Sequence, residues 1–173
     1  MSTESTLVRI TRRSLLALPL PLALGACGFA LRKAPEFSFQ SIYVAMPAGS
    51  ALGTELRRQL EGTGKVKVIT EAARRNEADV VLESLQDQRE RVVVGLNASG
   101  EVREFQLRVR FKFRVRTPAG KDVIPDTEIL RQLDQSYSET AALSKEAEAL
   151  MLYDNMQADI VQQVLRRLAT VKI

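Results

Sequence analysis

The chain has 173 residues, of which 25 are Lys or Arg and 21 are Asp or Glu, and it contains one Cys, no His and no Trp. Without His or a second Cys it cannot form the Ser-His-Asp or Cys-His catalytic arrangements or the common zinc sites. Carboxylates alone can support catalysis, but we find no paired Asp and Glu in a recognisable motif. We therefore expect neither an enzyme nor a bound metal or cofactor.

The amino-terminal segment has the features of a bacterial lipoprotein leader. Three arginines precede an apolar run over residues 15–24, which is shorter than the roughly 20 apolar residues that span a bilayer. Gly25 and Ala26 then precede Cys27, and small residues before a Cys mark the place where a leader is cut and the thiol is lipidated. The alternative, an ordinary apolar Cys, leaves this order of segments unexplained. We predict a signal peptide over residues 1–26 and acylation of Cys27, including palmitate.

The mature chain is expected to be one tethered domain with nearly balanced charge. The leader holds three of the 25 basic and one of the 21 acidic residues, so 22 basic and 20 acidic residues remain. This balance argues against a nucleic-acid partner. Residues 27–39 contain Pro35 and little periodicity, which predicts a tether before a single domain over residues 40–173. Paired arginines in the leader also resemble a twin-arginine signal, so export by that route or by Sec stays open.

The first half of the domain alternates strand and helix patterns. Residues 41–46 are rich in β-branched and aromatic residues and stop at Pro47, which predicts a strand. Ser50 precedes leucines at four-residue spacing, so we expect it to cap a helix over residues 51–61. The next expected elements are a strand at 66–69, a polar linker at 71–77, and a strand at 79–85 that can continue through 92–94 to a hairpin turn at 97–100.

The clearest periodicity of the chain lies at residues 105–116. Apolar residues at every odd position predict a long strand whose other face is basic. The basic side chains on that face are Arg108, Arg110, Lys112, Arg114 and Arg116. One interpretation is a solvated face neutralised by acids on neighbouring strands, such as Glu83, Asp87 and Glu128. The other is a docking face for an anionic partner, and lipid phosphate is the abundant anion beside a membrane.

The last part of the domain predicts a weaker strand and a long helix. The strand is expected near residues 128–137, after a turn at 117–121. Ser144 is expected to cap a helix that ends at about Ala169. Its expected apolar face comprises Leu150, Tyr153, Met156, Ile160, Val164 and Leu168. Two amphipathic helices can cover one face of such a sheet, so we predict an α+β two-layer sandwich with a mostly antiparallel four- to five-stranded sheet.

The start of the mature chain resembles a known family. Cys27-Gly28-Phe29-Ala30-Leu31-Arg32 is similar to the Cys-Gly-aromatic-x-Leu-Arg start of lipoproteins of the LptE family. Residues 56–60, 104–107 and 142–146 resemble that family's first helix, the strand after its hairpin and the start of its last helix. The resemblance implies a lipid-anchored protein on the periplasmic side of the outer membrane. It also implies a plug inside the β-barrel LptD that helps the barrel form, and binding of lipopolysaccharide during its transport.

The resemblance implies only part of a lipopolysaccharide-binding site. A basic residue is expected at the start of the last helix, where Lys145 stands. No basic residue lies at the hairpin tip, so Arg103, Arg89 and Arg91 are the nearest substitutes. The candidate lipopolysaccharide-binding residues are Lys145, Arg103, Arg108, Arg110 and Lys112. The alternative function is a free periplasmic lipoprotein that acts as a scaffold or binds an anionic ligand without a barrel partner.

Overall fold

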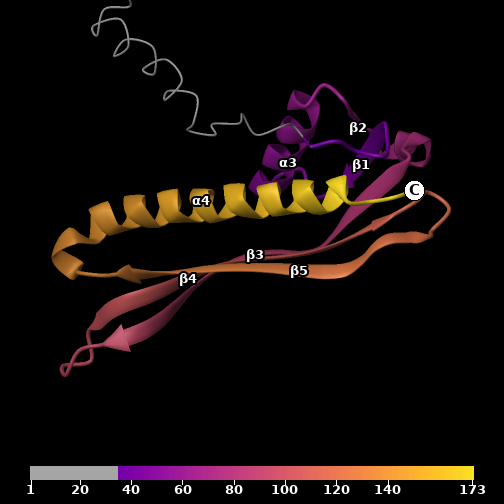
Figure 1. Ribbon diagram of the computed structural model, residues 1–173. Coiled ribbons are helices and arrows are strands. Elements are labelled where there is room, and N and C mark those ends of the chain that lie inside the picture. The colour runs from indigo at the N-terminus through magenta and orange to yellow at the C-terminus, as the bar shows by residue number, and fades with distance from the viewer. Residues whose placement is uncertain (1–34) are drawn as a thin grey trace, which may run out of the picture. The chain divides into compact units, whose positions relative to one another are not determined.

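The computed structural model describes residues 35–173, and the predicted leader, Cys27 and most of the predicted tether lie outside these residues. Five strands form one sheet in the order β2-β1-β3-β4-β5 (Figure 1). The strands are β1 (Ser41–Ala45), β2 (Lys67–Ile69), β3 (Val80–Leu96), β4 (Val102–Arg116) and β5 (Asp122–Ser136). The helices are α3 (Ala51–Gly62) and α4 (Ala142–Ala169), with 3-10 turns η1 (Ala72–Glu77) and η2 (Glu139–Ala141).

The sheet combines a parallel part with a longer antiparallel part. β1 pairs in parallel with both β2 and β3, whereas β3, β4 and β5 form an antiparallel meander. The helix α3 connects β1 to β2, and a helical crossover returns the chain in the same direction, so these two strands run parallel. The prediction of a mostly antiparallel α+β sheet is confirmed, with β1 as the strand that makes it mixed.

Both helices pack on the same face of the sheet, as predicted. α4 lies along β4 and β5 and contacts α3, which packs beside it near β2 (Figure 1). The core lies between these two layers. Its most deeply buried side chains come from both, and they include Leu56 and Leu60 of α3, Leu107, Phe111 and Phe113 of β4, and Ile160 and Leu168 of α4.

The two predicted helix starts have different outcomes. The Ser50 Oγ accepts a hydrogen bond from the Gly53 N–H at 2.9 Å, which confirms Ser50 as the cap of α3. The prediction for Ser144 is wrong, because η2 leads directly into α4 and the residue before the helix is Ala141. The Ser144 hydroxyl instead donates to the Ala141 carbonyl at 2.8 Å.

The buried face of α4 also differs from the prediction at its amino-terminal end. Leu150 is 60% exposed, and Ala149 is buried in its place. Ala149 lies eleven residues before the buried Ile160, which is about three helical turns, whereas Leu150 is rotated by roughly 100° from that line. The remaining residues of the predicted face, from Tyr153 to Leu168, are buried or half-buried.

Two stretches between the helices are more ordered than predicted. The expected polar linker at residues 71–77 contains the 3-10 turn η1. β5 begins at Asp122, six residues before the expected start, because its pairing with β4 extends over residues that are poor strand formers by themselves, including Pro125. The expected continuation of β3 through residues 92–94 is confirmed.

Candidate functional site

The basic face of β4 is largely neutralised by acids on its neighbours. The even-numbered residues of β4 lie on the side of the sheet opposite the helices, because the odd-numbered ones are buried under α3 and α4. Four of the five basic side chains form ion pairs: Arg110 with Glu128, Lys112 with Asp126 at 3.4 Å, Arg114 with Glu83 at 2.6 Å, and Arg116 with Asp122 at 2.6 Å. A neutralised face attracts an anionic ligand less than five free cations would.

Two of the residues expected at this face depart from the predicted pattern. Among residues 35–173, Arg108 forms no ion pair, and it donates to the Gln106 Oε1 at 2.7 Å. Asp87 does not neutralise the basic face, as its register opposite Phe111 places it on the helix side. Its Oδ2 accepts a hydrogen bond of 2.6 Å from the Ser50 hydroxyl, so Asp87 supports the start of α3 instead.

Glu83 joins two arginines from different elements. It accepts hydrogen bonds from Arg114 of β4 and Arg75 of η1. Chiefly the hydrogen bond from Arg114, and then that from Arg75, hold the pKa of the Glu83 carboxyl below its ordinary value, although burial acts in the opposite direction. This carboxylate therefore stays ionised between its two partners, and it ties η1 to the sheet.

Lys145 lies in the first turns of α4 and reaches the end of β5. Its Nζ donates to the Glu148 Oε2 at 2.7 Å and to the Ser136 Oγ at 3.1 Å. The hydrogen bond from Lys145 lowers the pKa of the Glu148 carboxyl. The Lys145 side chain is 22% exposed, and an ammonium has three N–H donors, so one donor remains for an external oxygen.

Gln135 positions the first turns of α4, and this role was not predicted from the sequence. Its side chain is buried, and its Nε2 donates to the Lys145 carbonyl at 2.8 Å. The register of β5 places Gln135 on the helix side together with Ile129, so strand alternation alone could have indicated its burial. Its partner on α4 could not be inferred in that way.

The substitutes considered near the hairpin are bound to α4 rather than free. The Arg91 guanidinium lies 3.8 Å from the centre of the Phe105 ring and pairs with Glu146. Arg89 lies 5.4 Å from the Tyr153 ring centre and 3.6 Å from the Asp154 carboxylate. Both arginines therefore hold β3 against α4 through ion pairs, and Arg89 adds a cation–π contact to Tyr153 of α4, whereas the Phe105 ring belongs to β4.

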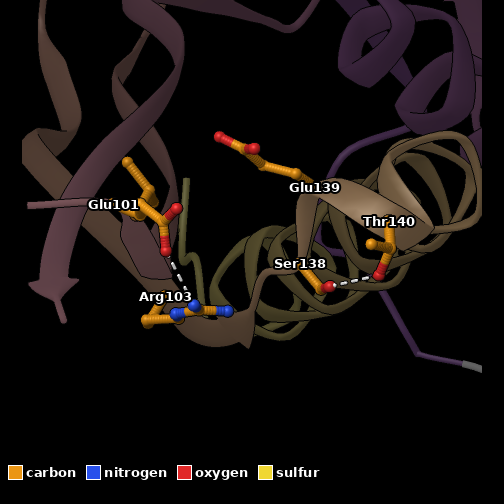
Figure 2. Close-up of a pocket in the computed structure, with 6 residues that line it drawn as sticks. Glu101, Arg103, Ser138, Glu139 and Thr140 are labelled. Atoms are coloured by element: carbon orange, nitrogen blue, oxygen red, sulfur yellow. Dashed lines mark hydrogen bonds and ion pairs between the residues drawn. The ribbon is translucent and has the colours of Figure 1, made fainter. Parts of the chain in front are cut away.

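Arg103 lines a small open pocket between β4 and η2. Figure 2 shows Glu101 and Arg103 on one side of this pocket, and Ser138, Glu139 and Thr140 on the other. The Arg103 Nη2 donates to the Glu101 Oε2 at 2.8 Å. The pocket thus has two carboxylates for one guanidinium, which does not favour binding of an isolated anion.

The structure brings only two of the five candidate residues to one end of the sheet. The Tyr137 N–H donates to the Arg103 carbonyl, and Lys145 reaches Ser136, the residue before Tyr137. Arg103 and Lys145 therefore lie at the same end, whereas Arg108, Arg110 and Lys112 lie along the opposite face of the sheet. The candidate site thus consists of two separate surfaces.

Exposed apolar side chains gather at this end as well. We call it the distal end, defined by the β3–β4 turn (residues 97–100) and the first turns of α4, and Figure 1 shows both at the left, away from the carboxyl terminus. Its exposed apolar residues are Val93, Val94 and Leu96 of β3 and Leu143, Leu150 and Met151 of α4. A partner bound at this end would bury some of these apolar side chains.

Within residues 35–173 the structure offers no membrane-spanning helix and no metal site. No helix in that range combines the length and the apolar character needed to cross a bilayer. In the same range no three side chains of the His, Cys, Asp and Glu types are grouped so that they could hold a metal ion.

Comparison with known proteins gives the family. Residues 39–168 match the LptE family model, which is described as lipopolysaccharide-assembly. The chain belongs to the LptE family. This match confirms the predicted family, whereas the start of the mature chain, residues 27–32, lies outside both the matched and the described residues.

Solved structures of other lipoproteins share the fold of this LptE-family chain. It is 32% identical to an uncharacterized lipoprotein B from Nitrosomonas europaea, with a TM-score of 0.67 over 80% of this chain and 88% of that one. The rare lipoprotein B from Shewanella oneidensis is 23% identical, with a TM-score of 0.63 over 76% and 95% of the two chains. A minor lipoprotein from Acinetobacter baumannii is 18% identical, with a TM-score of 0.61 over 78% and 93%. A search of curated proteins found no significant match.

Proposed function

We propose that this LptE-family chain is a lipid-anchored subunit on the periplasmic side of the outer membrane that plugs the β-barrel LptD. In this role it helps the barrel assemble and assists the insertion of lipopolysaccharide into the outer leaflet. The observation that carries the proposal is the family match over residues 39–168, nearly the whole predicted domain. The proposed role is one of binding and assembly and requires no catalytic group.

The lipid anchor would hold the domain at the inner leaflet. Each buried methylene contributes about 0.8 kcal/mol, and one acyl chain alone anchors a protein only marginally. Several chains on Cys27 would therefore give stable residence at the membrane. The described chain begins close to the carboxyl terminus, because the Ser38 hydroxyl donates to the Val171 carbonyl at 2.7 Å. The anchor would thus join the domain at the end remote from the distal end.

The charge pattern of the sheet suits a polar lumen. The inner wall of a large β-barrel is polar, so a plug must bring polar surface against it. Burying an unpaired charge is costly, whereas the paired side chains of Arg114 with Glu83 and Arg116 with Asp122 carry little net charge into such a contact. The exposed apolar residues of the distal end supply further surface for the barrel to cover.

Lys145 is the residue that we propose for lipopolysaccharide contact. Its third ammonium N–H can donate to a lipid phosphate while the other two hold Glu148 and Ser136. Arg103 lies at the same end, but its pairing with Glu101 makes it the weaker candidate. The face that carries Arg108, Arg110 and Lys112 fits the lumen wall better than it fits a lipid.

The test is a pull-down from cell envelopes in mild detergent through a tag at Ile173, whose side chain is exposed. The expected result is one large β-barrel protein in equimolar amount, identified by mass, and an untagged chain serves as the control. Recovery of the lipoprotein alone would overturn the plug proposal. That result would instead favour a free periplasmic scaffold or anionic-ligand binder.

A further inference from the structure

β5 is a long and regular strand at the edge of the sheet. Ten consecutive residue pairs, from Phe113 with Thr127 to Glu104 with Ser136, join it to β4 without a bulge. Within residues 35–173 no strand pairs with its other side, and Figure 1 shows β5 running the length of the sheet below α4. An edge of this kind leaves a row of backbone donors and acceptors without strand partners.

The register identifies which backbone groups face this free edge. The Tyr137 N–H donates to the Arg103 carbonyl at 2.8 Å, so these two residues form a hydrogen-bonded pair. Such pairs alternate in an antiparallel ladder, so the odd-numbered residues of β5 point their N–H and C=O groups toward β4. The residues whose backbone groups point to the free edge are Glu128, Leu130, Gln132, Asp134 and Ser136.

The devices that block an edge strand most effectively do not occur in this segment, although it carries the charged residues Glu128 and Asp134. Lysines that point outward, prolines and bulges commonly block the pairing of an edge with another chain. Pro125 lies before the regular segment, and residues 126–136 contain no Lys, Pro or Gly. Arg131 is turned toward α4, where its Nε forms an ion pair with the Asp159 carboxylate at 2.7 Å.

We infer that the free edge of β5 binds an extended segment of the barrel partner as a sixth, antiparallel strand. The inference rests on the proposed function and adds the surface and the mode of binding. Backbone hydrogen bonds to the even-numbered residues give the affinity, and side chains on the two faces of the added strand give the specificity.

A second copy of this chain fits the edge less well than a foreign strand. Two antiparallel self-pairings use the most residues of the regular segment, and they are centred on Arg131 and on Gln132. The first places Arg131 opposite itself and Glu128 opposite Asp134, which brings like charges together. The second places the apolar Leu130 opposite Asp134. Both registers are therefore disfavoured.

The side chains along the edge define the chemistry of the added strand. Among the described residues Asp134 has no ion-pair partner, and its Oδ1 accepts only from the Gln106 amide at 2.8 Å. Leu130 lies on the same face and is 41% exposed. The partner segment therefore carries a basic residue opposite Asp134 and an apolar residue four positions later, opposite Leu130.

Two substitutions block the edge without touching the pairing with β4. Gln132→Pro removes an N–H that points to the free edge, a position at which an edge strand tolerates proline. Leu130→Lys places a charge beside the free edge, as natural edge strands do. Leu85→Lys is the matched control, because Leu85 is a leucine of β3 with 40% exposure that lies away from the β5 edge.

The experiment compares how much barrel protein co-purifies with each full-length tagged variant. Gln132→Pro and Leu130→Lys are expected to lose about tenfold of the recovered barrel or more, while Leu85→Lys retains it. Full recovery with both edge variants would overturn the strand addition and leave the plug proposal standing, whereas absence of barrel with the unchanged chain would overturn both. If Gln132→Pro fails to fold, Leu130→Lys alone decides.

Discussion

The carboxylate of Glu83 lies between two guanidinium groups that belong to different elements. Arg114 belongs to the middle of the meander and Arg75 to the turn before β3, so one side chain joins two parts of the fold. Charge-assisted hydrogen bonds of this kind contribute more to stability than neutral ones. Glu83 is 16% exposed, which limits the weakening of these bonds by water.

Glu83→Gln is expected to lower the free energy of unfolding by about 1–2 kcal/mol at neutral pH, since a neutral amide replaces an acceptor of two charged hydrogen bonds. The folded-state pKa of Glu83 lies below its ordinary value of 4.5, so its contribution is complete above that value and disappears as the pH falls through the lowered one. The difference between the variant and the unchanged chain should therefore shrink with acidification in urea titrations.

Glu36→Gln is the control for this experiment. Glu36 is 89% exposed and lies 3.5 Å from Lys65, an arrangement that contributes little to stability in water. The two variants thus compare the loss of a largely buried carboxylate, Glu83, with the loss of a solvated one, Glu36. A Glu83→Gln difference that stays constant from neutral to acidic pH would contradict the linkage.

Substitutions of Lys145 and of Glu148 are expected to change the affinity for lipopolysaccharide in opposite directions. Lys145→Glu is expected to weaken binding by about tenfold, because a phosphate loses a cationic donor and meets a negative charge. Glu148→Gln should strengthen binding, because the ammonium then loses the carboxylate that neutralises it. A titration with purified lipopolysaccharide measures both.

Two further charge reversals test which surface binds lipopolysaccharide. Arg110→Glu probes the other face of the sheet, and Lys172→Glu near the carboxyl terminus controls for net charge. Equal affinities for the unchanged chain and Lys145→Glu would remove Lys145 from the proposed site. Weakening by Arg110→Glu alone would move the site to the basic face.

The candidate site could be predicted from the sequence only in part. The alternation in residues 105–116 correctly placed five basic side chains on one face, and Glu83 and Glu128 neutralise it as expected, but the third expected acid does not. Asp87 illustrates the limit, because a bulge between Ser84 and Gln86 shifts which residues face the helices. Gln135 and Lys145 meet across two elements, which no local pattern encodes.

At the scale of the elements, the two long helices begin in different ways. α3 starts at Ser50, whose oxygen accepts from the Gly53 N–H while its hydroxyl donates to Asp87. α4 grows out of η2 and has no side-chain cap at Ala141. Its first turns are held instead by contacts to β3 and β5, through Arg91 with Glu146 and Gln135 with the Lys145 carbonyl.

Ser50→Ala is expected to lower the free energy of unfolding by about 1 kcal/mol, because it removes the cap of α3. Ser144→Ala should change it by less than about 0.5 kcal/mol, because the exposed Ser144 is not a cap. Urea denaturation of both variants measures the difference. Equal losses would contradict the assignment of the two helix starts.

The strands show why some elements were easier to predict than others. β4 is buried on one face along its length, so its alternation is continuous and its bounds were nearly correct. β3 has two apolar runs separated by polar residues, because polar residues in its middle bind the cap of α3 and the side chains of α4, through Asp87 with Ser50 and Arg89 with Asp154. The start of β5 depends on pairing with β4 rather than on its own composition, and this kind of dependence is not visible locally.

At the scale of the whole molecule, the two ends of the domain differ. The end near the carboxyl terminus holds the first described residues through Ser38 and the buried Phe39. The distal end carries the β3–β4 turn, Lys145 and most of the exposed apolar side chains. An anchor on Cys27 would therefore present the distal end away from its own attachment point.

Cys27→Ala is expected to incorporate no palmitate and to retain the 26-residue leader, because the chain has no other thiol. Labelled palmitate and the intact mass of the purified protein measure the two effects. Gly28→Ala is the control and should be labelled normally, since it leaves the thiol and the small residues before it unchanged. Labelling of Cys27→Ala would contradict lipidation at this residue.

The position of β1 has a mechanical consequence. The chain from Ser38 runs directly into β1, which is flanked by β2 on one side and β3 on the other and is parallel to both. If Cys27 is anchored as proposed, tension on the amino terminus would act along the axis of β1 and load the hydrogen bonds on both sides at once, in shear. Bonds loaded together resist far more force than bonds that open one after another from a hairpin end. With such an anchor, the sheet would resist a pull from the membrane at the strand where that pull enters the domain.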